Sequence, residues 1–191
     1  ISNDGVVGTG MGLVTPIGVT VETFWSSLLE GRCGIGPVEG VEGEHLGLSV
    51  AAQIKDYDPR TPLKAWQRDK TILHSDRYSW LAAAAADQAI KQSTLELPLS
   101  NPYRAACIIG SAAGGQMSGE RGARNRFVDN KRAVHPMFLV RTIASSAAAH
   151  VGIEYGVKGA TYAINSAGAS AAHSISIGCD YIRRGQADIA I

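Results

Sequence analysis

Three long segments of the chain carry apolar side chains three and four positions apart, which is the spacing of an amphipathic helix. They are residues 19–31, 76–92 and 169–184. Asp76 is placed to cap the second helix, and Gly31 to end the first. The side chains expected to face inward are Phe24, Trp25, Leu28 and Leu29 in the first helix, and Tyr78, Leu81, Ala82, Ala85, Ala89 and Ile90 in the second.

Short apolar runs between the helices predict strands at residues 104–110, 161–167 and 187–191, and a further one at 49–54. The segment 5–18 is predicted to be an apolar strand that runs into a glycine-rich turn. A polar surface connection is expected at 60–75. The segment 133–156 is expected to enter one helix that ends near Gly156. Strands that alternate with helices indicate an α/β fold.

The predicted strand at 161–167 runs into the predicted helix at 169–184 with almost no loop, and Gly168 stands at the junction. Such a junction, or elbow, lifts one residue onto a helix N-terminus, where unpaired N–H groups and the positive dipole end favour a thiolate or an oxyanion. Glycine also suits a tight turn. The pattern alone leaves two interpretations open, a simple turn and a nucleophile site.

The composition is that of an ordinary globular domain. The 191 residues, of 20.1 kDa, are 45% hydrophobic and 18% charged, and the net charge of +1 argues against a nucleic-acid partner. No apolar stretch approaches the roughly 20 residues needed to cross a bilayer, and the start of the chain lacks the pattern of a secretion signal. We therefore expect one soluble, cytoplasmic domain over residues 1–191.

The three cysteines form no CxxC pair and no metal-ligand cluster, which indicates a reducing compartment. Cys107 and Cys179 lie in apolar patterns and are expected in the core. Cys33 lies in a glycine-rich loop, and the pattern leaves its role open.

The glycines near the start invite comparison with a dinucleotide-binding loop. The spacing is Gly8-x-Gly10-x-Gly12, but Leu13 stands where the third glycine should be. Pro16 prevents a helix from starting directly afterwards. Both departures argue against a cofactor loop.

Two other motifs have competing interpretations. The run Ser111–Gly115 follows a strand as a phosphate loop would, but it lacks the Gly-Lys-Ser/Thr ending. The run Gly168–Ala172 resembles the Gly-x-Ser-x-Gly elbow of serine hydrolases, with Ser170 as the nucleophile. Its last position is alanine, and no assignable Asp and His follow it.

The segment Asn165–Ile175 resembles the active-site segment of the elongating β-ketoacyl-[acyl carrier protein] synthases of the thiolase-like superfamily. That family has Ser/Thr-Ala-Cys-Ala/Thr-Ser/Thr followed shortly by a helical histidine, here His173. Every element is matched except the cysteine, whose place is taken by Gly168. The likeness covers nearly the whole chain but only about half of a full synthase. The other similar segments are 5–18, 32–37, 110–115 and 133–159.

This resemblance implies a thiolase-like layered α/β/α fold, with the chain forming the N-terminal half of a duplicated unit. The implied reaction is a decarboxylative Claisen condensation of acyl and malonyl thioesters in fatty-acid or polyketide elongation. The substrates are carried on the phosphopantetheine of an acyl carrier protein, with no further cofactor and no metal. Two catalytic histidines come from the other half in that family, and His173 is expected to be packed rather than catalytic.

Gly168 leaves the chain without a covalent acyl acceptor, so the chain alone is expected to be inactive in condensation. Three explanations remain open for it: an engineered Cys→Gly change, a non-catalytic partner subunit of the chain-length-factor kind, and a decarboxylase-like relic. A purely scaffolding half-domain is a further interpretation.

The implied partners are an acyl carrier protein, a ketosynthase in a homodimer or heterodimer formed through residues 161–167, and the C-terminal half of the same fold. No nucleic acid and no membrane is expected. The residues expected near the acyl pocket or dimer interface are Gly110, Ser111, Gly114 and Gly115. Two basic stretches are either solvated surface or a surface that steers the acidic carrier. The expected docking residues are Lys64, Arg68, Lys70, Arg124, Arg126, Lys131 and Arg132.

Overall fold

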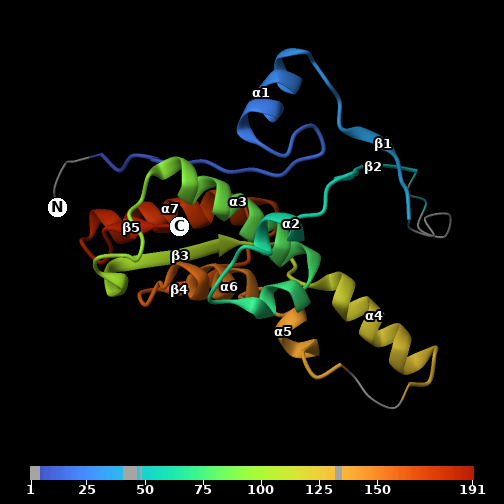
Figure 1. Cartoon of the computed structure of the whole chain (residues 1–191). Helices are drawn as coiled ribbons and strands as arrows, with labels where there is room; N and C mark the ends of the chain where they lie inside the picture. Colours follow the sequence, from blue (N-terminus) through green and yellow to red (C-terminus); the bar gives the residue numbers. More distant parts are fainter. Residues whose placement is uncertain (1–4, 41–46, 48, 132–134) are drawn as a thin grey trace.

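The computed structural model describes residues 5–40, 47, 49–131 and 135–191 (Figure 1). The helices are α1 (Val21–Leu29), α2 (Arg60–Leu63), α3 (Arg77–Ser93), α4 (Gln116–Phe127), α5 (Phe138–Thr142), α6 (Ser146–Tyr155) and α7 (Ser170–Arg183). The strands are β1 (Ile35–Pro37), β2 (Val50–Ala52), β3 (Ala105–Gly110), β4 (Thr161–Ile164) and β5 (Ile189–Ala190). Short 3₁₀ turns are η2 (Lys70–His74), η3 (Pro102–Arg104) and η4 (Ala167–Ala169).

A parallel sheet in the order β4-β3-β5 forms the centre, and its three strands lie within the segments predicted at 104–110, 161–167 and 187–191. Strand β3 lies in the middle and is buried, because both of its neighbours pair with it and helices cover both of its faces. A separate antiparallel ladder joins β1 to β2. The predicted strand at 49–54 is therefore confirmed as β2, and its partner β1 directly follows the loop that carries Cys33.

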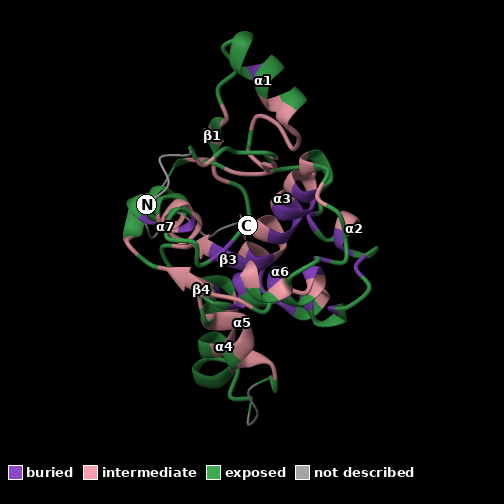
Figure 2. Cartoon of the chain, turned by 90° about the vertical axis from the view of Figure 1, so that its left-hand side faces the viewer, coloured by how far each residue is buried: buried purple, intermediate pink, exposed green. Residues whose placement is uncertain are grey.

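Alternate side chains of β3 face two different layers. Ala106 and Ile108 pack with residues of α7, while Cys107 and Ile109 belong to the cluster formed by α3 and α6. Figure 2 shows α7 on one side of β3 and the two other helices on the opposite side. The expected layered α/β/α architecture is confirmed.

Helix α3 begins after Asp76 as predicted, and the Asp76 carboxylate accepts the backbone N–H of Tyr78 at 3.4 Å. The expected inward face was largely wrong. The residues that the structure buries on α3 are Ser79, Ala83, Ala84, Ala86, Asp87 and Ile90, of which only Ile90 had been expected. The two faces differ because α3 is covered on two sides. One side packs against the core, and the N-terminal segment lies over Ala85 and Ala89 on the other side, so apolar residues on both sides obscure which one faces the core.

That N-terminal segment is extended but forms no strand between residues 5 and 14, so the predicted first strand is wrong. Its main chain is bonded to side-chain amides of α3 instead of to a sheet. Met11 donates its N–H to Oε1 of Gln92 at 2.6 Å, and Gln88 donates to the carbonyl of Leu13 at 3.2 Å. A Cβ on Gly12 would lie 1.9 Å from the carbonyl oxygen of Ala85, so glycine is what permits this close approach.

Helix α1 forms where it was predicted, and Gly31 follows it with φ +69°. Its apolar face is not inward, however. Trp25 is 57% exposed and Leu29 is 70% exposed. Figure 1 shows the reason, because α1 lies away from the layers around β3.

Two connections are more structured than their sequence suggested. The segment 60–75 is no polar connection, because α2 and η2 bring Leu63, Trp66 and Ile72 into the main core. The single helix expected over 133–156 is two helices, α5 and α6. Gly156 ends α6 in the left-handed conformation, as predicted.

The three cysteines differ in how far they are buried. Cys107 is fully buried, which confirms its core position, and burial raises the pKa of its thiol to about 12. Cys179 is only partly buried, and Cys33 is exposed. Because the thiolate is the reactive form, the three should differ in reactivity.

We expect iodoacetamide at pH 8 to modify Cys33 first and Cys179 more slowly in the folded protein, and to leave Cys107 intact. A raised pKa means that the Cys107 thiolate is scarce at pH 8 and appears only as the pH rises toward 12. Peptide mass mapping of native and urea-unfolded samples checks this order. Modification of native Cys107 at a rate close to that of Cys33 would contradict the burial described here.

Candidate functional site

The strand that precedes the elbow between β4 and α7 is shorter than predicted. The strand ends at Ile164, two residues lead into η4, and α7 begins at Ser170. Gly168 therefore lies in the short 3₁₀ turn directly before a 14-residue helix. The expected placement of residue 168 at a helix start is confirmed, while its role as the nucleophile position stays a prediction.

The turn does not need glycine at position 168. The residue with left-handed backbone is its neighbour Ala167, at φ +50°, whereas Gly168 is not among the positive-φ residues. A Cβ built on Gly168 meets nothing within 4 Å. The turn therefore does not require glycine at position 168, because a side chain there meets neither strain nor a clash. Both interpretations of the junction, a simple turn and a nucleophile site, stay open.

Ser170 is a structural residue of the elbow. It is 4% exposed, its hydroxyl donates to the carbonyl of Ala167 at 2.7 Å, and it accepts the N–H of Ser166 at 3.0 Å. A buried hydroxyl that donates one hydrogen bond and accepts another stabilises the turn. This geometry argues against Ser170 as the nucleophile of a serine hydrolase.

His173 is not packed, contrary to expectation. Its ring is exposed, and Nδ1 lies 2.7 Å from Oγ of Ser166. Ser166 and His173 are seven residues apart, and the reversal of the chain through η4 brings them together. The sequence signal for this pair was the histidine one turn into the helix, but only the turn geometry identifies its partner.

The glycine-rich run that begins at the end of β3 starts beside the elbow and continues to the end of α5. A Cβ on Gly110 would be 2.3 Å from the carbonyl oxygen of Ser170, so the absence of a side chain lets β3 approach α7. Ser111 donates its N–H to the carbonyl of Ile164 at 2.9 Å. Gly114 has φ +70°, and Gly115 donates its N–H to the carbonyl of Thr142 near the end of α5. The structure thus brings Gly110 and Ser111 beside the elbow and Gly114 and Gly115 against the end of α5, while the pocket or interface role of all four stays a prediction.

Aromatic packing holds α7 over β4. The rings of Tyr162 and Tyr181 have their centroids 6.4 Å apart. Burial and then a hydrogen bond with Tyr181 raise the pKa of Tyr162 to about 12, so its phenol stays neutral at physiological pH.

The predicted docking cations lie on two different elements. Lys64 and Arg68 are exposed around the end of α2. The ammonium of Lys70 donates back to the carbonyl of Trp66, so it is committed to its own loop. Arg124, Arg126 and Lys131 are exposed on α4 or just after it, and Arg132 lies outside the described residues. Figures 1 and 2 show α4 projecting away from the layers, so the two groups belong to separate parts of the surface.

The loop that carries Arg68 is fastened to α6 by a carboxylate that sequence reasoning missed. Glu154 accepts the backbone N–H groups of three successive residues, Gln67 at 2.9 Å, Arg68 at 2.8 Å and Asp69 at 3.1 Å. The buried Asp69 side chain also contacts Nδ1 of the buried His150, on the same helix. No local pattern pairs residues more than 80 positions apart, so only the fold reveals this anchor.

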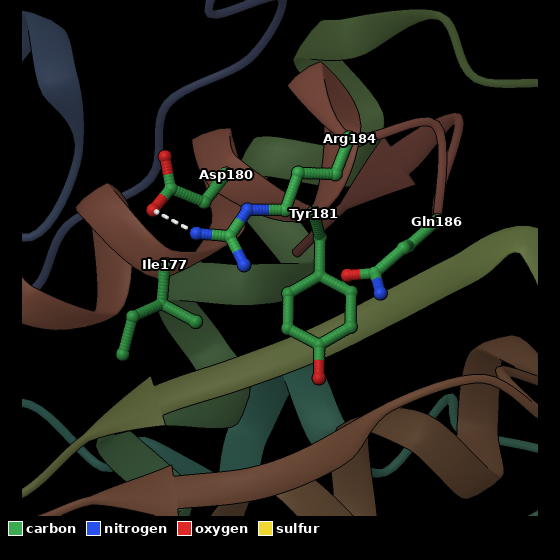
Figure 3. Close-up of a pocket in the computed structure, with 5 residues that line it drawn as sticks. All are labelled: Ile177, Asp180, Tyr181, Arg184 and Gln186. Carbon is green, nitrogen blue, oxygen red and sulfur yellow. Dashed lines mark ion pairs between the residues drawn. The ribbon is translucent and has the colours of Figure 1, made fainter.

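A surface cavity of about 360 Å³ lies toward the other end of α7 (Figure 3). Ile177, Asp180, Tyr181, Arg184 and Gln186 line it, and Arg184 and Asp180 form an ion pair at 3.8 Å. Ile177 is seven residues beyond Ser170, roughly 10 Å along the helix. This cavity is therefore separate from the elbow.

The described residues contain no group of three or more His, Cys, Asp and Glu side chains arranged to hold a metal ion. Across the same residues, no helix combines the length and the apolar character that a membrane span requires.

Residues 3–191 match the family described as "Beta-ketoacyl synthase, N-terminal domain". A 3-oxoacyl-[acyl-carrier-protein] synthase 2 from Coxiella burnetii is 31% identical over 186 residues, which cover 97% of this chain and 44% of that protein. The chain thus spans somewhat less than half the length of this relative.

Two solved structures share the fold. "The ishigamide ketosynthase/chain length factor" has a TM-score of 0.85 at 24% identity, covering 96% of this chain and 45% of that chain. A type II PKS acyl-carrier protein in complex with its ketosynthase has a TM-score of 0.73 at 23% identity, covering 95% of this chain and 42% of that chain. The thiolase-like fold expected from the sequence is confirmed.

We expect Ser170→Ala to lower the free energy of unfolding by about 1–3 kcal/mol, because it leaves the N–H of Ser166 without its partner in the elbow. Urea denaturation followed by circular dichroism measures the change. Ser176→Ala, at an exposed position of the same helix, is the matched control and should change stability by less than about 0.5 kcal/mol. Equal effects of the two substitutions would contradict the role given to Ser170.

Glu154→Gln should lower the free energy of unfolding by about 1–3 kcal/mol, because a neutral amide replaces the carboxylate that accepts three backbone N–H groups. Hydrogen exchange should quicken at Gln67, Arg68 and Asp69. The control is Glu120→Gln, an exposed position on α4. Unchanged exchange at all three amides would show that Glu154 does not anchor the loop.

Proposed function

The chain belongs to the β-ketoacyl synthase family, and from that premise we propose that it acts in decarboxylative Claisen elongation of carrier-bound thioesters as a non-condensing subunit. In this role it binds an acyl carrier protein and pairs with a cysteine-bearing ketosynthase, as a chain-length-factor-like partner. It does not itself form the acyl-enzyme through residue 168.

The observation that carries this proposal is the geometry at Gly168. The residue lies directly before a helix N-terminus, where developing negative charge is favoured. Neither backbone strain nor a neighbouring atom demands a glycine there. The elbow therefore retains the architecture that suits an acyl carbonyl but lacks a side chain at 168 to accept it.

The solved neighbours support the choice of partners. One is described as a ketosynthase/chain length factor, and another as an acyl-carrier protein in complex with its ketosynthase. We extend both kinds of association to this chain as part of the proposal. For the carrier, the exposed Lys64 and Arg68 offer the positive charge that an acidic partner requires.

The test is a condensation assay with the full-length protein, alone and after co-expression with a cysteine-bearing ketosynthase from the same organism. We expect the two to purify together, the pair to form the β-ketoacyl product, and the protein alone to form none. Condensation by the protein alone at the rate of the pair would overturn the non-condensing role.

The double variant Lys64→Glu/Arg68→Glu should slow association with the acyl carrier protein about tenfold or more at low salt, because two attractive charges become repulsive. Stopped-flow or surface-plasmon measurements at two ionic strengths give the rates. The matched control Arg183→Glu/Arg184→Glu reverses two exposed charges at the end of α7 and should have little effect. Equal slowing by both variants would show that only net charge matters, and not a docking site around α2.

A further inference from the structure

The Ser166–His173 pair is not used by the function proposed above. Oγ of Ser166 and Nδ1 of His173 are 2.7 Å apart, which is hydrogen-bond distance for a hydroxyl that donates to a neutral imidazole. A nucleophile and a base within this reach form the basic unit of hydroxyl activation. His173 is exposed and Ser166 is half-buried, so the described residues leave the pair open.

The surroundings of the pair favour an incoming acyl group. Residues 167–169 are all exposed, and the space over Gly168 has no atom within 4 Å of a built Cβ. The pair also lies at the start of α7, whose positive dipole end stabilises negative charge on a tetrahedral intermediate. Ser170, the other serine of the elbow, is buried and its hydroxyl both donates and accepts a hydrogen bond, so it does not compete with Ser166 as a nucleophile.

We propose that Ser166 is an acyl-accepting nucleophile and His173 its general base, which gives the elbow a slow thioesterase activity toward acyl thioesters. The inference rests on the proposed function only in taking an acyl thioester as the substrate class. It adds a catalytic site two residues before the position where the cysteine would stand.

The reaction has two steps. Oγ of Ser166 attacks the thioester carbonyl while Nδ1 of His173 takes the hydroxyl proton. The carbon–sulfur bond then breaks, the imidazolium returns the proton to the leaving thiolate, and an ester forms on Ser166. In the second step water attacks this ester with His173 again as the base, which releases the carboxylic acid and restores the hydroxyl.

The experiment uses the full-length protein and hexanoyl-N-acetylcysteamine as the thioester probe. Release of free thiol gives the hydrolysis rate, and intact mass followed by peptide mapping locates the hexanoyl group. We expect the adduct on Ser166. The rate should fall at least tenfold in Ser166→Ala and in His173→Gln, since general-base catalysis contributes about 10²–10⁴-fold. Ser174→Ala, on the same helix, is the matched control and should keep the full rate.

A wild-type rate equal to that of Ser166→Ala, or an adduct found only outside residue 166, overturns the inference. The double variant Ser166→Ala/Gly168→Cys separates the two proposals, because it tests whether an acyl group reaches the elbow at all. Acylation of the double variant at position 168 without acylation of wild-type Ser166 overturns this inference and leaves the proposed function standing. Failure of both acylations, together with failure to bind the acyl carrier protein, counts against the proposed function as well.

Discussion

The elbow depends on the close approach of β3 to the first turn of α7. At Gly110 the two backbones come so near that any Cβ would lie 2.3 Å from the carbonyl of Ser170. The buried Ser170 hydroxyl then ties the turn to the start of the helix. Because β3 is the central, buried strand, this contact fixes the helix start relative to the core. The placement of Gly168, Ser166 and His173 all follows from it.

A second set of contacts, on the other face of the sheet, positions a charged side chain at the surface. Helix α6 packs against β3 and carries Glu154, which holds the loop around Arg68 by its backbone. A loop fixed in this way presents the exposed Arg68 side chain from a defined base, and the Arg68 guanidinium lies over Gly156 at the end of α6. The same helix therefore connects the core to the surface expected to meet a carrier protein.

The sequence predicted the three central strands and helices α1, α3 and α7, because the apolar spacing that marks a strand or a helix is a local property. It also located the elbow, since a strand that runs directly into a helix is visible in the residues themselves. It failed where contacts join distant segments. Ala85 was assigned to the core because no pattern shows that a glycine-rich segment covers it. The partner of Glu154 lies 85 to 87 positions away, beyond any local signal.

Glycine at position 168 loses more conformational entropy on folding than a residue with a side chain would, although the fold does not require glycine there. A residue with a side chain, placed where glycine is sterically unnecessary, typically gains about 0.4–1 kcal/mol by restricting the unfolded chain. On thermodynamic grounds alone, position 168 therefore favours alanine over the glycine that it has. The fold does not depend on which residue stands at position 168. A single substitution there can therefore add or remove a reactive group without a change in the backbone.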